Sequence, residues 1–450
     1  LGAILVYFII AYIFIKMFKS PWIAGVAYLA FGVMQPQYIW FWHFESLPFT
    51  PSKILAILAI LSWLIAALNN KIDFDIYKRK QNLVLLVMWL WIHLSHLTTP
   101  FPGGAAYTGP ELVLSTLNTI MILYFVCIGI LTHQSGLKYM SILMAVLVTY
   151  YVYWSNDQYL SGNWSQFTQG RLRGPNYSVY RDENVFSTLF VVGMPFILYG
   201  FFYLKEKLLR YSPLMIIPLL WHSLFLIGSR GAMISTLIAT LITSKLCPSK
   251  LFDKVIVIGF VVAMLTQGGA MLNRSSETYS QSQNEEREGA LNPRLISWQH
   301  GLTFIIKHPI TGVGVQKFQQ ATRVYFPSDT PYVAHNTFLQ LAANSGILVG
   351  LLYLYLFKLI YRDYRYCVNN DVKRYPLLDY SNKAIATSLA GFFISAIFLD
   401  LMIFEAFYYL LAMNIIKQYL FEKKISTDTN ASNDEPSPTT LKPRDINGRL

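Results

Sequence analysis

Long uncharged, apolar runs recur along the whole chain, and they constrain its fold more than any other feature of the sequence. Each run has about 16 to 22 residues, which is enough for a helix to cross a hydrocarbon layer of roughly 30 Å. Of the 450 residues, 54% are hydrophobic and only 13% are charged, whereas soluble domains have about 25% charged residues. Because backbone polar groups in lipid must be satisfied internally, the runs predict an all-α, polytopic membrane bundle of about 12 or 13 transmembrane helices.

The runs also predict where the bundle begins and ends. The expected spans are 3–18, 21–34, 53–68, 83–98, 111–131, 139–155, 185–203, 212–228, 231–246, 255–271, 337–360, 384–399 and 403–421. The first two are short and could form a tight hairpin. The bundle is therefore expected over 1–421, and the polar segment 422–450 is predicted to be a disordered cytoplasmic tail.

Basic residues are divided unequally between the two sides of this bundle. One side holds about twice as many Lys and Arg residues as the other, so the positive-inside rule places it in the cytoplasm. The two longest connections, 156–184 and 272–336, then face outward. The net charge of +12 is spread between the apolar runs and forms no single stripe, which argues against nucleic acid as a partner.

The connection 272–336 is expected to be partly helical. Its first part is polar and predicted to be mobile. A second part carries apolar residues at helical spacing. They are Leu295, Trp298, Leu302 and Ile305. Asn292 is the expected N-cap with Pro293 at the first helical position, and Pro309 ends the helix, which should lie across the mouth of the bundle.

Two arginines lie where outward connections meet apolar or amphipathic segments. Arg230 occupies a Gly-Ser-Arg-Gly break between two runs, and Arg294 falls in the first turn of the predicted helix. A charge at a membrane edge is costly without a partner or a wet cavity, and two converging guanidinium forks suit a diphosphate. Alternatives stay open, because Arg294 could snorkel to lipid headgroups and Arg230 could anchor a tight turn.

Three further arginines, Arg171, Arg173 and Arg181, lie in the connection 156–184 and are possible substrate-binding residues. For Arg181 a local ion pair with the acidic residues that follow it is the simpler interpretation. No carboxylate cluster with metal-ligand spacing accompanies the arginines in the sequence. This pattern favours neutralisation of a phosphate by side chains and predicts no metal site.

His335 and Asn336 stand together at the edge of the run 337–360. An unperturbed imidazole titrates near 6.5, so its neutral form can accept a proton at an outer membrane face, and neighbouring arginines would lower its pKa. His335 is therefore the candidate catalytic base, with Asn336 as a possible substrate-binding neighbour. The alternative is a histidine that only caps a helix or bonds Asn336.

Three segments together resemble the O-antigen ligase and Wzy polymerase superfamily. They are GSRGA (228–232), NPRLISWQHGLTFIIKHPITGVGVQKF (292–318) and AHNTFLQLAANSGILVG (334–350). The resemblance covers about 185–350, and the combination is more specific than any one segment. The N-terminal stretch that includes PWIAGVAYLAFGVMQPQ is similar to the leading region of ligase-like members linked to exopolysaccharide and protein-sorting clusters.

The resemblance implies a GT-C-like, inverting, metal-independent membrane glycosyltransferase that uses no cofactor. It implies a glycan on undecaprenyl diphosphate as donor, at the periplasmic face of the bacterial inner membrane. His335 matches the family's base, and Arg230 and Arg294 match the arginines that hold the diphosphate. Asp400 is a possible match to an acidic residue near the last outer turn.

The expected function is therefore O-antigen ligation to lipid A–core in lipopolysaccharide biosynthesis. A Wzy-type polymerase and a protein O-oligosaccharyltransferase stay open, because they share the donor chemistry and differ in the acceptor. A lipid-linked glycan transporter is the rival from another class. It would need charged groups near the bilayer midplane and broken helices in repeated halves, and the sequence has neither an internal repeat nor mid-span carboxylates.

Overall fold

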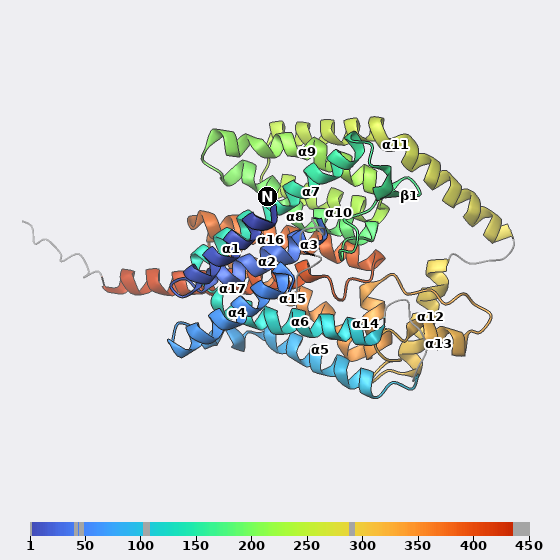
Figure 1. The fold of residues 1–450 in the computed structure, drawn as a ribbon, viewed down its shortest axis with the longest axis horizontal. Coiled ribbons are helices and arrows are strands. Elements are labelled where there is room, and N and C mark those ends of the chain that lie inside the picture. The colour runs from blue at the N-terminus through green and yellow to red at the C-terminus, as the bar shows by residue number, and fades with distance from the viewer. Residues whose placement is uncertain (1, 40–43, 45–48, 102–108, 288–292, 435–450) are drawn as a thin grey trace, which may run out of the picture.

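Helices form at every predicted span in a computed structural model of the chain, which describes residues 2–39, 44, 49–101, 109–287 and 293–434 (Figure 1). The helices are α1 (Gly2–Met17), α2 (Trp22–Met34), α3 (Pro36–Ile39), α4 (Pro51–Leu68), α5 (Lys80–Leu97), α6 (Pro110–Ile130), α7 (Gln134–Leu160), α8 (Glu183–Tyr203), α9 (Lys207–Ile227), α10 (Arg230–Leu246), α11 (Lys250–Arg287), α12 (Pro293–Lys307), α13 (Phe318–Tyr325), α14 (Thr337–Ser345), α15 (Ile347–Asn369), α16 (Pro376–Phe398) and α17 (Glu405–Asp434). Strands β1 (Phe167–Thr168) and β2 (Arg171–Leu172) form one short hairpin.

The described helices confirm the predicted fold class. By length and hydropathy, six of them are able to cross a membrane, namely α4, α6, α7, α8, α9 and α16. The protein is thus an all-α, multi-pass membrane protein. α8 is apolar all round and buried on almost every side, with α7, α9, α10 and α16 packed around it.

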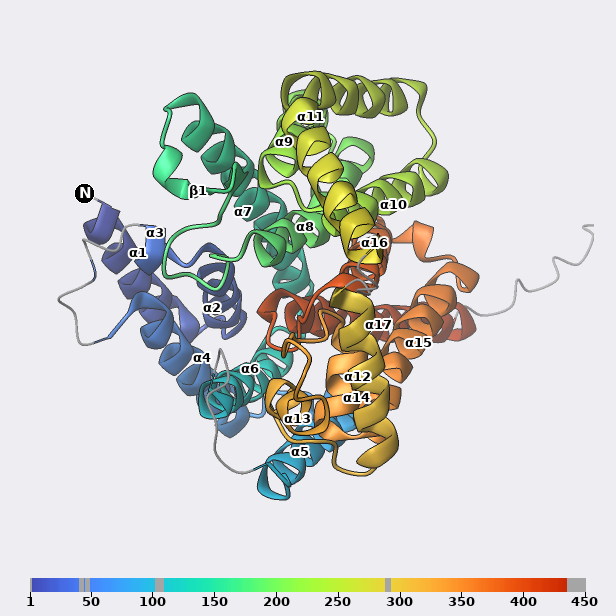
Figure 2. The ribbon, with the colours of Figure 1, turned by 90° about the vertical axis from the view of Figure 1, so that its right-hand side faces the viewer.

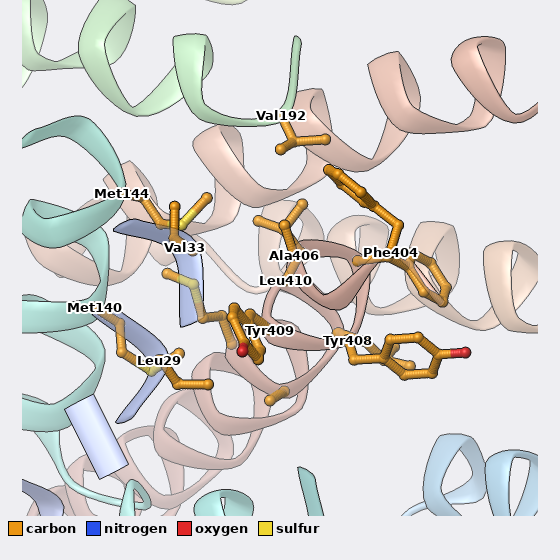
Figure 3. Packing of buried hydrophobic residues seen from close by; sticks show 14 of the residues in the cluster. Leu29, Val33, Met140, Met144, Val192, Phe404, Ala406, Tyr408, Tyr409 and Leu410 are labelled. Carbon is orange, nitrogen blue, oxygen red and sulfur yellow. The ribbon is translucent and has the colours of Figure 1, made fainter. Parts of the chain in front are cut away.

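A second packed region joins the first helices of the chain to the last. Figure 3 shows Leu29 and Val33 of α2 and Met140 and Met144 of α7 facing Tyr409 of α17. Flexible methionine side chains fill the irregular space beside the aromatic ring. The N-terminal helices are therefore held to the bundle by α7 and by the long C-terminal helix.

The run 337–360 forms two helices, α14 and α15, where a single span is predicted. The break is at Gly346, whose φ of +89° is a conformation that residues with a side chain rarely adopt. A Cβ on Gly346 would also lie 1.9 Å from the carbonyl oxygen of Ile310. The turn lets the loop 309–314 pack on the junction, where the Val313 N–H donates to the Ala343 carbonyl over 2.9 Å.

Two polar segments are helical where mobility or disorder is predicted. α11 continues to Arg287 and projects beyond the bundle (Figure 1), and α17 continues to Asp434, so the prediction of disorder is wrong for 422–434. Each extension continues an existing span, which supplies the helix nucleus, so propagation needs only modest local propensity. The predicted cap Asn292 and the rest of the tail lie outside the described residues.

α12 begins at Pro293 and ends at Lys307 as predicted, but its buried face is a different one. Its buried residues include Gly301 and Phe304, whereas Leu295 and Leu302 are 50% and 56% exposed. Gly301 allows this packing, because a Cβ there would lie 2.8 Å from Leu339 of α14. The apolar stripe is consequently only partly buried, with Trp298 and Ile305 at intermediate exposure.

The short helices and the hairpin gather at one end of the bundle (Figure 1). Figure 2 looks onto this end and shows α12 lying across α14. The far end of α5 closes the same region, since the Ser95 hydroxyl donates to the Asn344 carbonyl over 2.8 Å. This end carries all of the connections in which site residues are predicted.

Candidate active site

His335 occupies the loop that leads into α14, and its backbone is strained. Its φ of +47° lies in the left-handed region, where residues other than glycine are uncommon and are often held for function. The indole Nε1 of Trp298 donates a hydrogen bond to the Ala334 carbonyl over 2.9 Å, and the Ala334 N–H donates to Gln340 Oε1 over 3.2 Å. α12 and α14 thus hold the peptide before the histidine from both sides.

The first turn of α14 is anchored by the two residues after the histidine. Asn336 is the N-cap, and its Oδ1 accepts a hydrogen bond from the Leu339 N–H over 3.1 Å. The Thr337 hydroxyl donates to the Leu399 carbonyl over 2.7 Å and accepts from the Leu401 N–H over 3.0 Å. The start of α14 is thereby fixed to the loop between α16 and α17.

The pKa of His335 is lowered from its ordinary value of 6.5. Burial among protein atoms is the largest cause and the positive charge of Arg294 is the second, while the Asp182 carboxylate opposes both. No described residue forms a hydrogen bond with the ring, and the side chain remains accessible from outside. A neutral, accessible imidazole without an internal partner can accept a proton from an incoming hydroxyl.

Arg230 and Arg294 stand in the first turns of two helices and repel each other. Arg230 is the first residue of α10, and Arg294 is the second residue of α12. Burial lowers the pKa of Arg294, and the positive charge of Arg230 lowers it further. The two guanidinium groups add to the positive ends of two helix dipoles, which favours an anion at this place.

Arg294 lies within electrostatic reach of both Arg230 and His335. The three residues come from α10, from α12 and from the loop before α14, which are far apart in the sequence. The structure therefore brings together one imidazole and two guanidinium groups at the end of the bundle shown in Figure 2. Two such forks match the oxygens of a diphosphate, and the imidazole lies beside them.

Arg171 has a structural role at the edge of this cluster. Its Nε donates to the Ile227 carbonyl over 3.0 Å, its Nη1 pairs with Glu183 over 2.6 Å, and its Nη2 donates to Asn184 Oδ1 over 3.0 Å. These bonds hold β2 to the end of α9 and to the start of α8. The charges of Arg171 and Arg230 also act on each other, so Arg171 adds to the positive potential.

Arg173 and Arg181 lie in the same outward loop. Arg173 bonds within the hairpin, and Arg181 is exposed. The ion pair predicted for Arg181 is wrong, because within the described residues it forms none. Glu183 pairs with Arg171 instead, and Asp182 caps α8 by accepting from two backbone N–H groups.

Asp400 lies in the loop between α16 and α17, and its charge acts on two tyrosine hydroxyls and not on the arginine pair. Burial raises its pKa to about 6. Its charge acts on the hydroxyls of Tyr353 and Tyr408, and among the described residues no electrostatic contact links it to the arginine pair. The described residues also contain no group of three or more His, Cys, Asp or Glu side chains that could hold a metal ion.

An apolar groove with a volume of about 330 Å³ opens beside the histidine, between α12, α14 and α15. It is lined by Trp298, Leu302, Ile305, Asn336, Phe338, Leu339, Ala342, Ile347, Gly350, Leu351 and Leu354. Asn336, the residue after the candidate base, is one of the lining residues, and Leu351 and Leu354 are exposed. The groove is apolar and lies against the helix whose first turn carries Arg294, an arrangement that suits an amphiphile with an anionic head.

Two family models match the chain. Residues 214–354 match the family described as O-antigen ligase, and residues 2–203 match a family of unknown function, DUF5935. The segment 214–354 is thus similar to the O-antigen ligase superfamily. No curated protein matches the chain.

The segment matched by the O-antigen ligase family runs from α9 into α15 and contains the imidazole and both guanidinium groups of the candidate site. Arg230, Arg294 and His335 all lie within it, whereas Arg171 and Asp400 lie outside it. The superfamily is one of glycosyltransferase-like enzymes. The matched segment is therefore also the part of the chain whose geometry suits an anionic ligand.

Sequence reasoning missed the residues that hold His335 in place. Helical spacing assigns Trp298 to an apolar stripe, but its indole N–H bonds the peptide before the histidine. Gln340 reaches back to the same peptide, and Thr337 bridges to another loop; no spacing rule reveals either contact. Asp182 is recognisable in the sequence as a helix cap, and only the fold shows that its charge reaches His335.

Proposed function

We propose that the protein transfers a glycan from undecaprenyl diphosphate to a sugar hydroxyl at the periplasmic face of the bacterial inner membrane. Lipid A–core is the proposed acceptor, which makes the reaction O-antigen ligation. The observation that carries the proposal is the position of Arg294, whose charge acts on both Arg230 and His335. An anion-binding pair beside a candidate base is the arrangement that this transfer requires.

The reaction is an inverting displacement at the sugar C1. The acceptor hydroxyl attacks C1 from the face opposite the diphosphate, the C1–O bond to the diphosphate breaks, and undecaprenyl diphosphate leaves with the electron pair. His335 takes the proton of the hydroxyl as the new C1–O bond forms. Arg230 and Arg294 stabilise the negative charge that develops on the leaving diphosphate.

The apolar groove supports a lipid-linked donor over a soluble sugar nucleotide. A polyprenyl chain needs an apolar path that begins beside the diphosphate, and the lining of the groove includes Asn336, the residue after the candidate base. Its exposed residues on α15 would let the chain continue into the outer leaflet. The repulsion between the two arginines is relieved when the anionic head binds.

The proposal is tested by a reconstitution with purified protein in detergent, a defined lipid-linked glycan donor and lipid A–core. We expect a glycosylated lipid A–core that mass spectrometry detects. The variant His335→Ala should lose turnover while it still binds the donor. Product formation by that variant at the wild-type rate would show that His335 is not the base.

The acceptor decides between three related functions. Parallel reactions offer lipid A–core, a second lipid-linked glycan or a Ser-containing peptide, and the product formed fastest identifies a ligase, a polymerase or a protein O-oligosaccharyltransferase. If the protein is a transporter, none of the three reactions should give product, because a transporter moves its substrate between two compartments and detergent solution has only one.

A further inference from the structure

A second cavity lies at the end of the bundle opposite the candidate active site. Its volume is about 320 Å³, which is comparable with that of ligand pockets of roughly 300 Å³ and above. It is lined by Lys78, Arg79, Lys80, Gln81, Arg362, Asp363, Tyr366, Ile415, Gln418 and Glu422. Lys78 and Arg79 precede α5, and the other residues come from the start of α5 and from α15 and α17.

The position of this distal cavity follows from the length of α5. Lys80 begins the helix, and Ser95 near its other end contacts the region of the candidate active site. A helix of 18 residues is about 27 Å long, which is close to the thickness of a hydrocarbon layer. The distal cavity therefore lies at the level of the headgroups on the other membrane surface.

Basic side chains outnumber acidic ones around the distal cavity. Its cations are Lys78, Arg79, Lys80 and Arg362, and its carboxylates are Asp363 and Glu422. Arg79 is already bound, since its two Nη atoms pair with the Glu422 carboxylate over 2.9 and 2.6 Å. Lys80 is exposed and has no hydrogen bond or ion pair within the described residues, so its charge is available to a ligand.

Arg362 is also available, because its carboxylate neighbour has other partners. It donates one hydrogen bond to Asp363 Oδ1 over 3.2 Å. The other carboxylate oxygen accepts from Gln81 and from Asn414, and the charge of Lys417 acts on the same group. Asp363 thus keeps both hydrogen bonds of its second oxygen when Arg362 turns toward an anion.

The charge of Lys80 is badly placed unless an anion is near. It stands at the first position of α5, where the positive end of the helix dipole lies and where a cation is unfavourable. An anion in the distal cavity would interact favourably with Lys80, with the helix dipole and with Arg362 at once. A phosphate has the charge and the oxygen atoms for these contacts.

An apolar stripe on α5 points to a lipid as the source of that phosphate. Leu83, Val87, Leu90 and Leu94 follow Lys80 at steps of three and four residues, so they lie on the same helix face. All four are exposed. An acyl chain attached to a phosphate beside Lys80 would therefore run along an apolar surface.

We propose that the distal cavity binds the phosphate headgroup of an anionic membrane lipid, whose chains lie along this stripe of α5. Lys80 and Arg362 are the residues that contact the phosphate, and Tyr366 adds a hydroxyl at the rim. The same chemistry occurs where basic pockets between membrane helices bind anionic headgroups. The proposal is independent of the reaction at the opposite end.

The experiment measures lipid binding to the delipidated full-length protein by native mass spectrometry. Phosphatidylglycerol, phosphatidylcholine and free glycerol phosphate are titrated separately. The variant K80Q/R362Q removes the two available cations, and K71Q/R365Q is its matched control. Each variant replaces one Lys and one Arg, so both lose the same charge. Lys71 and Arg365 are exposed and lie outside the cavity lining.

We expect wild type and the control to prefer phosphatidylglycerol over phosphatidylcholine, and K80Q/R362Q to bind phosphatidylglycerol roughly tenfold or more weakly. Both variants should keep the wild-type melting temperature, because the altered side chains are exposed. Equal loss in the two variants, or none in K80Q/R362Q, would overturn the proposal. Glycerol phosphate that binds as tightly as phosphatidylglycerol would assign the distal cavity to a soluble phosphate and overturn the lipid assignment.

Discussion

The indole N–H of Trp298 reaches the carbonyl oxygen of Ala334 over 2.9 Å, so α12 holds the peptide that precedes His335. The same helix carries Arg294 in its first turn. A shift of α12 would therefore move the proposed base and Arg294, one of the two arginines proposed to bind the diphosphate, together. In the proposed reaction, these two groups act on opposite sides of the reacting carbon.

Trp298→Phe should lower turnover without abolishing donor binding. The phenyl ring keeps most of the apolar contact but cannot donate the hydrogen bond, so the imidazole loses its fixed direction. We expect kcat to fall roughly 10- to 100-fold, because small misplacements of catalytic groups are costly. The control is Trp91→Phe, which removes an equivalent indole bond, 2.9 Å long, to the Ile310 carbonyl. Equal effects in the two variants would show that Trp298 only stabilises the fold.

Asp182→Asn should move the acidic limb of the pH–rate profile to lower pH. The Asp182 carboxylate favours the imidazolium form of His335, so its removal lowers the pKa further and leaves the base neutral in more acidic solution. Asparagine keeps the N-cap of α8. The measurement is kcat/KM against pH, with Asp157→Asn as an exposed control. A limb that stays in place or moves to higher pH would contradict the assignment of His335 as the base.

The fold class and the helix positions follow from the sequence because the membrane leaves few alternatives. Uncharged runs of this length must form helices, and Pro293 starts α12 where its missing N–H is harmless. The break at Gly346 escapes the same reasoning, since the chain is apolar again directly after it and the whole run is free of charged residues as far as Phe357. Only the approach of Ile310 shows why the chain must turn there.

The candidate site is predictable in composition but not in arrangement. Arg230, Arg294 and His335 stand out because each is polar at an apolar boundary, and a single sequence cannot show that they meet. The structural role of Arg171 likewise depends on the fold, because its ion pair with Glu183 forms only when the hairpin packs against the start of α8. Patterns along the chain report what each segment prefers, whereas these contacts depend on how the segments pack.

Inorganic pyrophosphate should stabilise the protein through Arg230 and Arg294. A bound anion relieves the repulsion between the two guanidinium groups, so the melting temperature should rise with pyrophosphate concentration. Arg230→Gln and Arg294→Gln should each lose most of this rise and lower kcat by about 10²- to 10³-fold. Arg323→Gln is the control, because Arg323 is an exposed arginine on α13. An undiminished rise in the first two variants would exclude the pair as the diphosphate site.

Gly346→Ala should destabilise the end of the bundle that carries the site. The added Cβ would collide with the Ile310 carbonyl, and φ at this position is +89°. We expect a loss of about 2 kcal/mol or more in unfolding free energy. Gly170→Ala separates the two causes, because Gly170 has a φ of +69° but no atom within 4 Å of the position that a Cβ would take. It should cost only about 1 kcal/mol. Similar melting temperatures for both variants would show that the contact with Ile310 does not matter.

Leu354→Trp should reduce the use of long-chain donors while sparing short-chain ones. Leu354 lines the apolar groove on α15, and a larger ring there would obstruct a polyprenyl chain. We expect kcat/KM for an undecaprenyl-linked donor to fall roughly tenfold, which corresponds to about 1.4 kcal/mol of lost apolar contact. A donor with a truncated prenyl chain should react at the wild-type rate, because it does not reach this part of the groove. Tyr361→Trp provides the control, since Tyr361 is exposed on the same helix outside the groove. If Leu354→Trp slowed both donors equally, the chain would have to leave the site by another path.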